Sequence, residues 1–367
     1  MAHPAPHRGP KLLPIVVLAT VLVACSSGAS PSSEAVEPSE DAPSSAPAAS
    51  ESAPGDVASQ LPPAETTSLQ ICLQPHMSGL AGYVAESEGI YEKYGLDVEL
   101  VPFEGDGPMA QALAAGQVAG CYMGAGPTFS ATAAGEPLQM VFVTLDYLVD
   151  SLVTPDTIED GDDLRGQNVA ISTFGGESHT IVLFALQDLG LTADDVTIVQ
   201  VGGQGDRYAA LQAGAVQAAP IEGIPDEELA SLGLHKLVNL RDIGERFART
   251  GLVIDVDFKN ENPNTVLRLV AATMEAQNLW LNDPEVGIRV YMDALDVDED
   301  EGRINVEPAL DTDPTGRMTA DMFNVQKEAL ASANPAIEAV DNSEVFDASF
   351  LDELESLGFN EELGISN

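Results

Sequence analysis

The segment ALAAGQV at residues 112–118 returns later in the chain as ALQAGAV at residues 210–216. In both copies Ala and Leu favour a helix, Gly stands where a helix end needs a left-handed residue, and Val opens a short apolar run typical of a buried strand. Ala-Gly helix ends are common, so a chance match is the alternative. As a repeat, the pattern predicts two similar α/β lobes that enclose a cleft, which is where small ligands usually bind.

Strand and helix patterns alternate around both copies of the repeat. In the first lobe, apolar runs predict strands at 69–73, 96–101 and 118–123, with a helix at 108–115, and a connecting strand at 138–144 and a further run at 151–154 leave this lobe. In the second lobe they predict strands at 168–172, 196–201 and 216–221, with a helix at 207–213, and a strand at 252–256 leads back from it. This alternation indicates βαβ units and a parallel sheet. Beyond these lobes the sequence predicts helices at 263–281, 284–294, 314–331 and 346–357.

The N-terminus has the order of a targeting segment. Arg8 and Lys11 precede an apolar stretch at 12–23, which is too short to span a bilayer and therefore predicts a signal peptide. Leu-Val-Ala-Cys, ending at Cys25, resembles the lipobox of bacterial lipoproteins. The resemblance implies cleavage before Cys25 and a diacylglycerol on its thiol. An ordinary signal peptide with an incidental cysteine is the alternative.

A segment of biased composition follows the signal peptide. Residues 26–67 are dominated by Ser, Pro, Ala and Glu and contain no Phe, Tyr or Trp. Such a segment cannot bury enough apolar surface to offset the entropy of ordering. It therefore predicts a disordered tether that holds the folded part beside the membrane.

The strongly negative net charge excludes nucleic-acid binding as a function. The chain has 59 acidic and 15 basic residues, a formal net charge of −44. Phosphate contacts need clustered Lys and Arg, so nucleic-acid binding is excluded, and anionic lipid surfaces are disfavoured. The acidic residues are spread along both lobes and predict a solvated surface. Their mutual repulsion would be tolerable in a saline medium, which gives the hypothesis of a salt-tolerant source.

Two cysteines, Cys72 and Cys121, remain after Cys25. Both fall on predicted strands, and an extracellular location permits a disulfide between them. Direct bridges between neighbouring parallel strands are uncommon, so two free, buried thiols are the preferred expectation.

Several short motifs occur in a fixed order. They are YVA at 83–85, GIY at 89–91, YGLDVEL at 94–100, DLRG at 163–166 and ENP at 261–263, with both repeats among them. Over roughly residues 68–285 this order resembles the solute-binding proteins of ABC importers for nitrate, sulfonates, taurine and pyrimidine precursors. The resemblance implies an α/β, type II periplasmic-binding-protein fold, with two α/β lobes, a central ligand cleft and two crossover strands.

By that resemblance the chain divides into five parts. They are a lipoprotein signal peptide at 1–25, the tether at 26–67, the first part of lobe I at 68–148, lobe II at 149–252, and the return to lobe I with the C-terminal helices at 253–367. The lobe boundaries follow the family pattern, in which the chain crosses twice between lobes.

Candidate ligand-binding residues follow the carboxyl ends of the predicted strands. Ligands of open α/β sheets bind there, where helix N-termini offer free N–H groups. The candidates are Gln74, His76, Asp106, Gly126, Thr128, Phe174, Gly175, Gly176, Ser178, His179, Thr180, Gly203 and Glu222. Gly175 and Gly176 let the backbone approach a ligand closely, although a tight turn capped by Ser178 explains them equally well.

The sequence supports a metal site or a catalytic site less well than it supports a ligand-binding site. His76 and His179 lack partners at metal-ligand spacing, and no metal site or cofactor is expected. The acidic stretch at 296–307 is spaced like a Ca²⁺ loop, but Glu301 stands where such a loop needs Gly. Relatives that act on pyrimidine precursors have a His where this chain has Gly79, and those that are enzymes carry a cysteine cluster that is absent here. No catalytic residue is therefore assigned.

The nature of the ligand is less defined than the fold. Helix N-termini suggest an oxyanion, but Asp146, Glu177 and Glu222 add negative charge near the cleft. Four aromatic residues could enclose a flat heterocycle or belong to the core. They are Tyr122, Phe129, Phe174 and Tyr208. A neutral or nitrogen-bearing organic ligand is preferred.

These patterns together predict a receptor rather than an enzyme. We expect an extracytoplasmic monomer, held to the bilayer by lipid on Cys25, that closes around a small molecule and docks on an ABC permease. One alternative is a pyrimidine-precursor-synthesising enzyme of the same fold. Another is a ligand-sensing partner of a signalling receptor.

Overall fold

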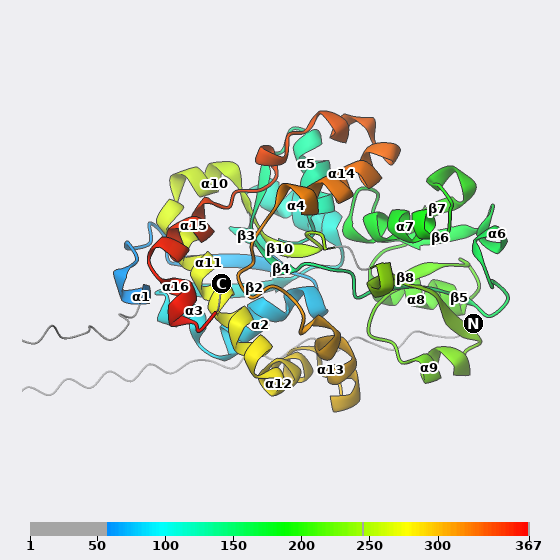
Figure 1. Ribbon diagram of the computed structural model, residues 1–367, viewed down its shortest axis with the longest axis horizontal. Helices are drawn as coiled ribbons and strands as arrows, with labels where there is room; N and C mark the ends of the chain where they lie inside the picture. Colours follow the sequence, from blue (N-terminus) through cyan, green and yellow to red (C-terminus); the bar gives the residue numbers. More distant parts are fainter. Residues whose placement is uncertain (1–56, 244–245, 366–367) are drawn as a thin grey trace, which may run out of the picture. The chain divides into compact units, whose positions relative to one another are not determined.

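Residues 57–243 and 246–365 are described by the computed structural model, shown in Figure 1. The predicted signal peptide, its lipidation site Cys25 and the predicted tether up to residue 56 lie outside these residues. No helix in the described part of the chain is both long and apolar enough to cross a membrane.

The two repeats end their helices in the same way. Helix α4 (Asp106–Ala114) and helix α8 (Gln204–Gln212) are each followed by a left-handed glycine, Gly116 with φ 65° and Gly214 with φ 69°. After α4 the N–H of Gln117 donates to the carbonyl of Ala112 at 2.9 Å, and the second copy has the equivalent bond from residue 215 to residue 210. These paired bonds form a Schellman motif, which confirms the predicted glycine stop.

Lobe I is built on a five-stranded sheet with strand order β2-β1-β3-β10-β4. Its strands are β1 (Ser68–Leu73), β2 (Asp97–Pro102), β3 (Gly120–Met123), β4 (Leu138–Leu145) and β10 (Thr250–Asp255). Strand β1 runs parallel to β2 and β3, whereas β10 runs antiparallel to both β3 and β4. The expectation of a parallel sheet is therefore wrong for β10, because the chain returns from lobe II in the opposite direction.

Lobe II holds the other strands and is drawn in green in Figure 1. They are β5 (Ser151–Pro155), β6 (Asn168–Ile171), β7 (Thr197–Gln200), β8 (Ala219–Ile221) and β9 (Leu234–Asn239). Strand β5 pairs antiparallel with β8 and β9, and β6 pairs parallel with β7. A single parallel bridge between Val169 and Ala218 links the two groups. The run at 151–154, predicted to leave lobe I, forms β5 of lobe II.

Helices cover both lobes. Those up to β10 are α1 (Val57–Gln60), α2 (Leu80–Ser87), α3 (Ile90–Lys93), α5 (Ala125–Ala133), α6 (Gly161–Leu164), α7 (Glu177–Asp188) and α9 (Asp226–Ser231). The later ones are α10 (Val256–Glu261), α11 (Pro263–Asn282), α12 (Pro284–Leu295), α13 (Glu299–Val306), α14 (Ala320–Ala333), α15 (Ser349–Ser356) and α16 (Phe359–Glu362). Helix α11 packs on α2, α3 and β4 of lobe I, and α14 contacts both α5 and α7.

The end of the predicted tether is folded. Val57, Ala58 and Leu61 are at most 6 % exposed and belong to the core of lobe I. Glu65 accepts a hydrogen bond from the N–H of Thr265 at 2.8 Å, which fixes the segment on the start of α11. The prediction of disorder is therefore wrong for residues 57–67, because a few apolar residues in a polar stretch suffice to dock it on an existing core.

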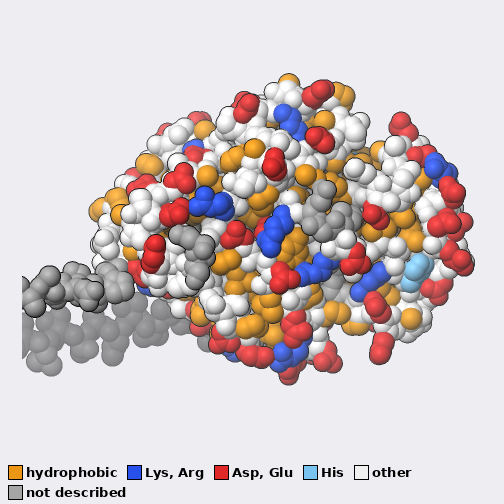
Figure 2. Space-filling model, viewed as in Figure 1, with side chains coloured by type: hydrophobic (Ala, Val, Ile, Leu, Met, Phe, Trp, Pro, Cys, Tyr) orange, Lys and Arg blue, Asp and Glu red, His pale blue; other side chains and the backbone are white. Residues whose placement is uncertain are grey.

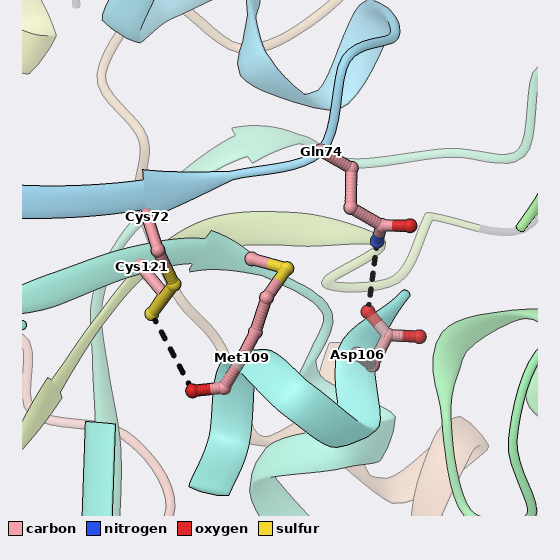
Figure 3. The surroundings of a disulfide bond; sticks show 5 residues. All are labelled: Cys72, Gln74, Asp106, Met109 and Cys121. Carbon is pink, nitrogen blue, oxygen red and sulfur yellow. Dashed lines mark hydrogen bonds between the residues drawn. A yellow bond between two sulfur atoms is a disulfide. The ribbon is translucent and has the colours of Figure 1, made fainter. Parts of the chain in front are cut away.

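A disulfide joins Cys72 on β1 to Cys121 on β3 (Figure 3). The two residues are direct partners in the parallel register, with their Cα atoms 4.3 Å apart. The expectation of two free thiols is wrong, because the register places the two cysteines opposite each other on neighbouring strands. The sequence separation between two predicted strands does not tell which residue of one strand lies opposite which residue of the other.

Acidic side chains are distributed widely over the visible face of the molecule (Figure 2). They lie over both lobes and are interspersed with fewer Lys and Arg side chains. This distribution agrees with the expectation of a solvated acidic surface and gives no single acidic patch on that face.

Candidate functional site

Two segments cross between the lobes side by side. Residues 146–150 connect β4 to β5, and residues 246–249 lead into β10. The N–H of Phe247 donates to the carbonyl of Asp146 at 2.9 Å, so the two segments are bonded to each other along their backbones. The side chains of Asp146 and Arg246 also form an ion pair across them. These segments are the two predicted crossovers between the lobes.

Arg249, at the end of the second crossing segment, lies at the centre of a buried ion-pair network. Its guanidinium Nη2 lies 2.6 Å from Oε2 of Glu222 and 3.0 Å from Oδ2 of Asp150, and its Nε lies 3.4 Å from Oε1 of Glu177. Arg249 is 2 % exposed, and each of the three acids is at most 8 % exposed. One cation therefore holds carboxylates from a crossing segment (Asp150), from the start of α7 (Glu177) and from the end of β8 (Glu222).

The carboxylates of this network have different protonation equilibria. Burial raises the pKa of Glu177 to about 7, even though Arg249 favours its charged form. Burial also raises the pKa of Asp150. For Glu222 burial acts in the same direction, but Arg249 and His76 outweigh it and hold the pKa at about 2. Glu222 is thus the permanent negative charge of the network, while Glu177 can take up a proton near neutral pH.

Asp106 connects the network to lobe I. It begins α4, is 2 % exposed, and accepts a hydrogen bond from the Gln74 amide at 3.1 Å (Figure 3). Its other oxygen accepts the backbone N–H of Glu177 at 2.7 Å. That N–H is the first of α7, so the carboxylate of Asp106 occupies the positive end of this helix. Burial raises the pKa of Asp106, and the Glu177 N–H opposes this effect.

His76 faces Glu222 from lobe I. Its Nδ1 accepts the N–H of Ser78 at 3.3 Å and lies 2.8 Å from the Ser78 hydroxyl. The same nitrogen is 3.1 Å from Oε1 of Glu222, so the two form an ion pair when His76 is protonated. Burial disfavours the imidazolium, but the Glu222 carboxylate outweighs burial and raises the pKa of His76. Neutral His76 therefore caps the turn at Ser78, whereas protonated His76 pairs with Glu222.

Two connected spaces lie between the lobes. The inner cavity has a volume of about 20 Å³ and is lined by four carboxylates, two arginines and His76, together with polar side chains from both lobes. The outer chamber has a volume of about 350 Å³ and shares Gln74, His76 and Gln204 with the inner cavity. Its other walls are Pro75, Glu104, Gly205, Tyr208, Ile221 and Ile224.

Five of the candidate ligand residues meet at the inner cavity. They are Gln74, His76, Asp106, Ser178 and Glu222. The hydroxyl of Ser178 is also the acceptor for the N–H of Ser172 at 2.7 Å, so it joins the end of β6 to α7. The loop candidates Phe174, Gly175 and Gly176 instead line a separate pocket of about 430 Å³ against α4 and α5.

The other candidates contact the protein itself. Thr128 and Thr180 donate to backbone carbonyls one turn earlier in their helices, at 2.9 and 3.3 Å, and His179 accepts the N–H of Gly175 at 3.0 Å. A side chain at Gly126 would lie 2.5 Å from Oγ1 of Thr180, and one at Gly203 would lie 2.5 Å from Oε2 of Glu104. Their proposed contacts with a ligand stay predictions.

Gly175 on the loop before α7 lies close to a side chain of lobe I. Its φ of +77° favours glycine, and a Cβ there would lie 2.5 Å from Oγ of Ser130 on α5. The Ser130 hydroxyl donates to the Gly175 carbonyl at 2.9 Å. The close approach expected for a ligand is therefore made here by a side chain of lobe I.

The aromatic residues divide between core and cleft. Tyr122 and Phe129 are 0 % exposed, and the Tyr122 hydroxyl lies 2.9 Å from that of Thr273 inside lobe I. For these two residues the core alternative is confirmed, and they do not enclose a ligand. Tyr208 lines the outer chamber, and Phe174 is 60 % exposed on its loop.

Sequence reasoning missed Arg249 and Asp150. Both are single charged residues outside any motif, and their meeting depends on how the crossing segments pair. The one available signal was scarcity, because an arginine immediately before an apolar strand stands out among 15 basic residues.

The acidic stretch near α13 has a structural use, since Asp298 accepts the N–H of Glu301 at 3.0 Å as a helix cap. No group of three or more His, Cys, Asp or Glu in the described ranges is arranged to hold a metal ion.

Comparisons with known proteins agree with this architecture. The family described as NMT1/THI5 like matches residues 76–286. A Brucella abortus protein named as a candidate binding protein is 23 % identical over 220 residues, which cover 59 % of this chain and 67 % of that protein. The periplasmic aliphatic sulphonate binding protein SsuA of Escherichia coli superposes with a TM-score of 0.59 and 22 % identity, over 76 % of this chain and 92 % of that one. The periplasmic nitrate-binding protein NrtA of Synechocystis superposes with a TM-score of 0.65 and 13 % identity, over 82 % of this chain and 91 % of that one. The fold is the periplasmic-binding-protein fold.

Proposed function

The chain belongs to the NMT1/THI5-like family, and on that premise we propose that it is the extracytoplasmic solute-binding component of an ABC importer. It captures a small organic solute between its lobes, closes around it, and delivers it to a membrane permease. Relatives of known structure include proteins named for aliphatic sulphonate and nitrate binding, which supports capture of a small polar solute.

One observation carries the proposal: the inner cavity is assembled from both lobes and both crossing segments. Gln74 and Asp106 come from lobe I, Glu177 and Glu222 come from lobe II, and Arg249 comes from the second crossing segment. A volume of about 20 Å³ holds no more than a water molecule. A solute therefore enters only when the lobes separate, and the crossing segments are the hinge about which they do so.

The same residues support binding without chemistry. Cys72 and Cys121 are joined in a disulfide, so neither supplies a thiol nucleophile. Arg249 pairs with both Glu177 and Glu222, and the one hydroxyl that donates to Glu177, that of Thr250 at 3.2 Å, belongs to a fully buried residue of β10 that a solute does not reach. The cleft serves to recognise a solute, and the importer supplies the energy for its transport.

Anchoring at Cys25 completes the proposal. A diacylglycerol on this residue would hold the receptor beside its permease, with residues 26–56 as the connection. Mass spectrometry of the N-terminal peptide from the membrane fraction tests the modification. Cys25→Ser should release the protein into the soluble extracytoplasmic fraction, and retention in the membrane would refute the anchor.

A thermal-shift panel tests the binding function. It contains taurine, alkylsulfonates, nitrate, hydroxymethylpyrimidine, riboflavin and a set of organic amines and amidines. A true solute at 100-fold excess over its dissociation constant stabilises the protein by about 2.7 kcal/mol. If no compound of any class raises the melting temperature, the binding function loses its support.

A further inference from the structure

We infer that the solute is a small organic cation, whose positively charged nitrogen is held by the carboxylates between the lobes. This inference rests on the proposed function and narrows it to one class of ligand. Most charged groups of the cleft already have partners within the protein, and these partners limit the charge that a solute can carry.

The arginines of the cleft have most of their donors bound within the protein. Arg249 directs its guanidinium to Asp150, Glu177 and Glu222. The other cleft arginine, Arg207, donates to the carbonyls of Gly202 and Pro220, at 3.0 and 3.2 Å. An anionic solute would have to displace carboxylates to pair with Arg249.

The positive end of α7 is occupied as well. Its first N–H donates to the carboxylate of Asp106 at 2.7 Å, so a side chain of lobe I takes the place where an oxyanion would otherwise bind. An anionic solute at this position would have to displace a carboxylate and then sit beside Glu177 and Glu222. In a buried site, the negative charge of the solute and these neighbouring carboxylates would repel each other strongly.

One buried acceptor, in contrast, has a titratable partner. Glu222 lines the inner cavity, and its Oε1 lies 3.1 Å from Nδ1 of His76, which pairs with it only when protonated. Glu222 is 5 % exposed, and its neighbour His76 Nδ1 already accepts the N–H of Ser78. Neutral His76 donates nothing to this oxygen from Nδ1, and an ammonium or amidinium N–H would then supply a charge-assisted hydrogen bond.

The outer chamber suits the rest of such a ligand. Its walls include Pro75, Tyr208 and Ile224, which can contact a small apolar body. Glu104 adds a carboxylate, and neither Lys nor Arg is part of the lining. With a volume of about 350 Å³, the chamber falls within the range of small-molecule sites. The inner cavity accordingly binds the charged group, and the chamber binds the apolar part.

Charge-matched probes test the inference on the full chain. Calorimetry compares benzamidine, benzamide and benzoate, then benzylamine against phenylmethanesulfonate, so that each set keeps the ring and changes the charge. We expect the cations to bind at least about 10-fold more tightly than the neutral probe, which is the value of one charge-assisted hydrogen bond. The anions should bind more weakly still.

Two variants assign the effect to the site. Glu222→Gln should weaken benzamidine binding at least about 10-fold, and Glu104→Gln, which changes an exposed residue, should weaken it about threefold. Asp97→Asn removes the same charge at the opposite end of the lobe I sheet and should leave binding unchanged. Circular dichroism confirms that each variant is folded, and the probe ranking of the unaltered protein does not depend on any variant.

The outcomes separate the two proposals. Binding of anions in preference to cations overturns the inference while leaving the receptor function intact. Failure of every cation, including the amines and amidines of the thermal-shift panel, also overturns it. Failure of all compounds of every charge refutes the receptor function itself.

Discussion

Replacing Arg249 by Met should destabilise the protein strongly. The change removes the cation that lies 2.6, 3.0 and 3.4 Å from Glu222, Asp150 and Glu177, and leaves three buried carboxylates without it. Breaking a buried ion pair from one side typically costs about 3–5 kcal/mol. At roughly 2–4 °C per kcal/mol for a large domain, the melting temperature should fall by about 6–20 °C. Urea unfolding at pH 7.5 measures the free energy of unfolding directly.

Arg303 provides a matched control for this experiment. It also contacts three carboxylates, those of Glu285, Glu299 and Glu307, but all four side chains are on the surface. Solvent and salt screen such contacts, so Arg303→Met should change stability very little. Equal losses in the two variants would refute the reasoning, because burial would then make no difference to the value of an arginine with three acidic partners.

Three further predictions follow from the disulfide, the surface charge and the titrating groups. Replacing Cys72 and Cys121 together by Ala should cost about 4 kcal/mol in urea unfolding, from the loop entropy of a 49-residue separation, and a loss below about 1 kcal/mol would contradict a structural bridge. With a net charge of −44, the melting temperature should rise between 0.1 and about 1 M NaCl as screening shortens from about 10 to about 3 Å, whereas a flat response would argue against self-repulsion. The affinity for benzamidine, measured by calorimetry, should fall between pH 8 and pH 6. Glu177, with a pKa of about 7, and His76, whose pKa is raised, both take up protons in this range and reduce the negative charge of the site. Tighter binding at pH 6 would contradict this assignment.

The local parts of the fold were predictable from the sequence. The glycines at 116 and 214 stop their helices in the left-handed conformation, as the repeat predicted, because that conformation is a property of a few neighbouring residues. The alternation of strands and helices was predictable for the same reason. The direction of β10 was not, since it depends on where the chain re-enters lobe I after lobe II.

The candidate site was predictable in position but not in chemistry. Gln74 and Asp106 meet at one cavity because they follow the parallel strands β1 and β2, and Glu222 meets them there from the facing lobe. Arg249 and Asp150 were missed, since their contact exists only after two crossing segments pair. The disulfide was missed because register, rather than composition, puts Cys72 opposite Cys121.

A crystal structure of the complex with the tightest-binding solute of the panel shows directly where the solute binds. We expect the solute to lie between the lobes, with a nitrogen within about 3.2 Å of Oε1 of Glu222 and further contacts to Asp106 or Gln74 of lobe I. A solute bound to one lobe alone, or an anionic group placed against Arg249 in the position of the internal carboxylates, would contradict this expectation.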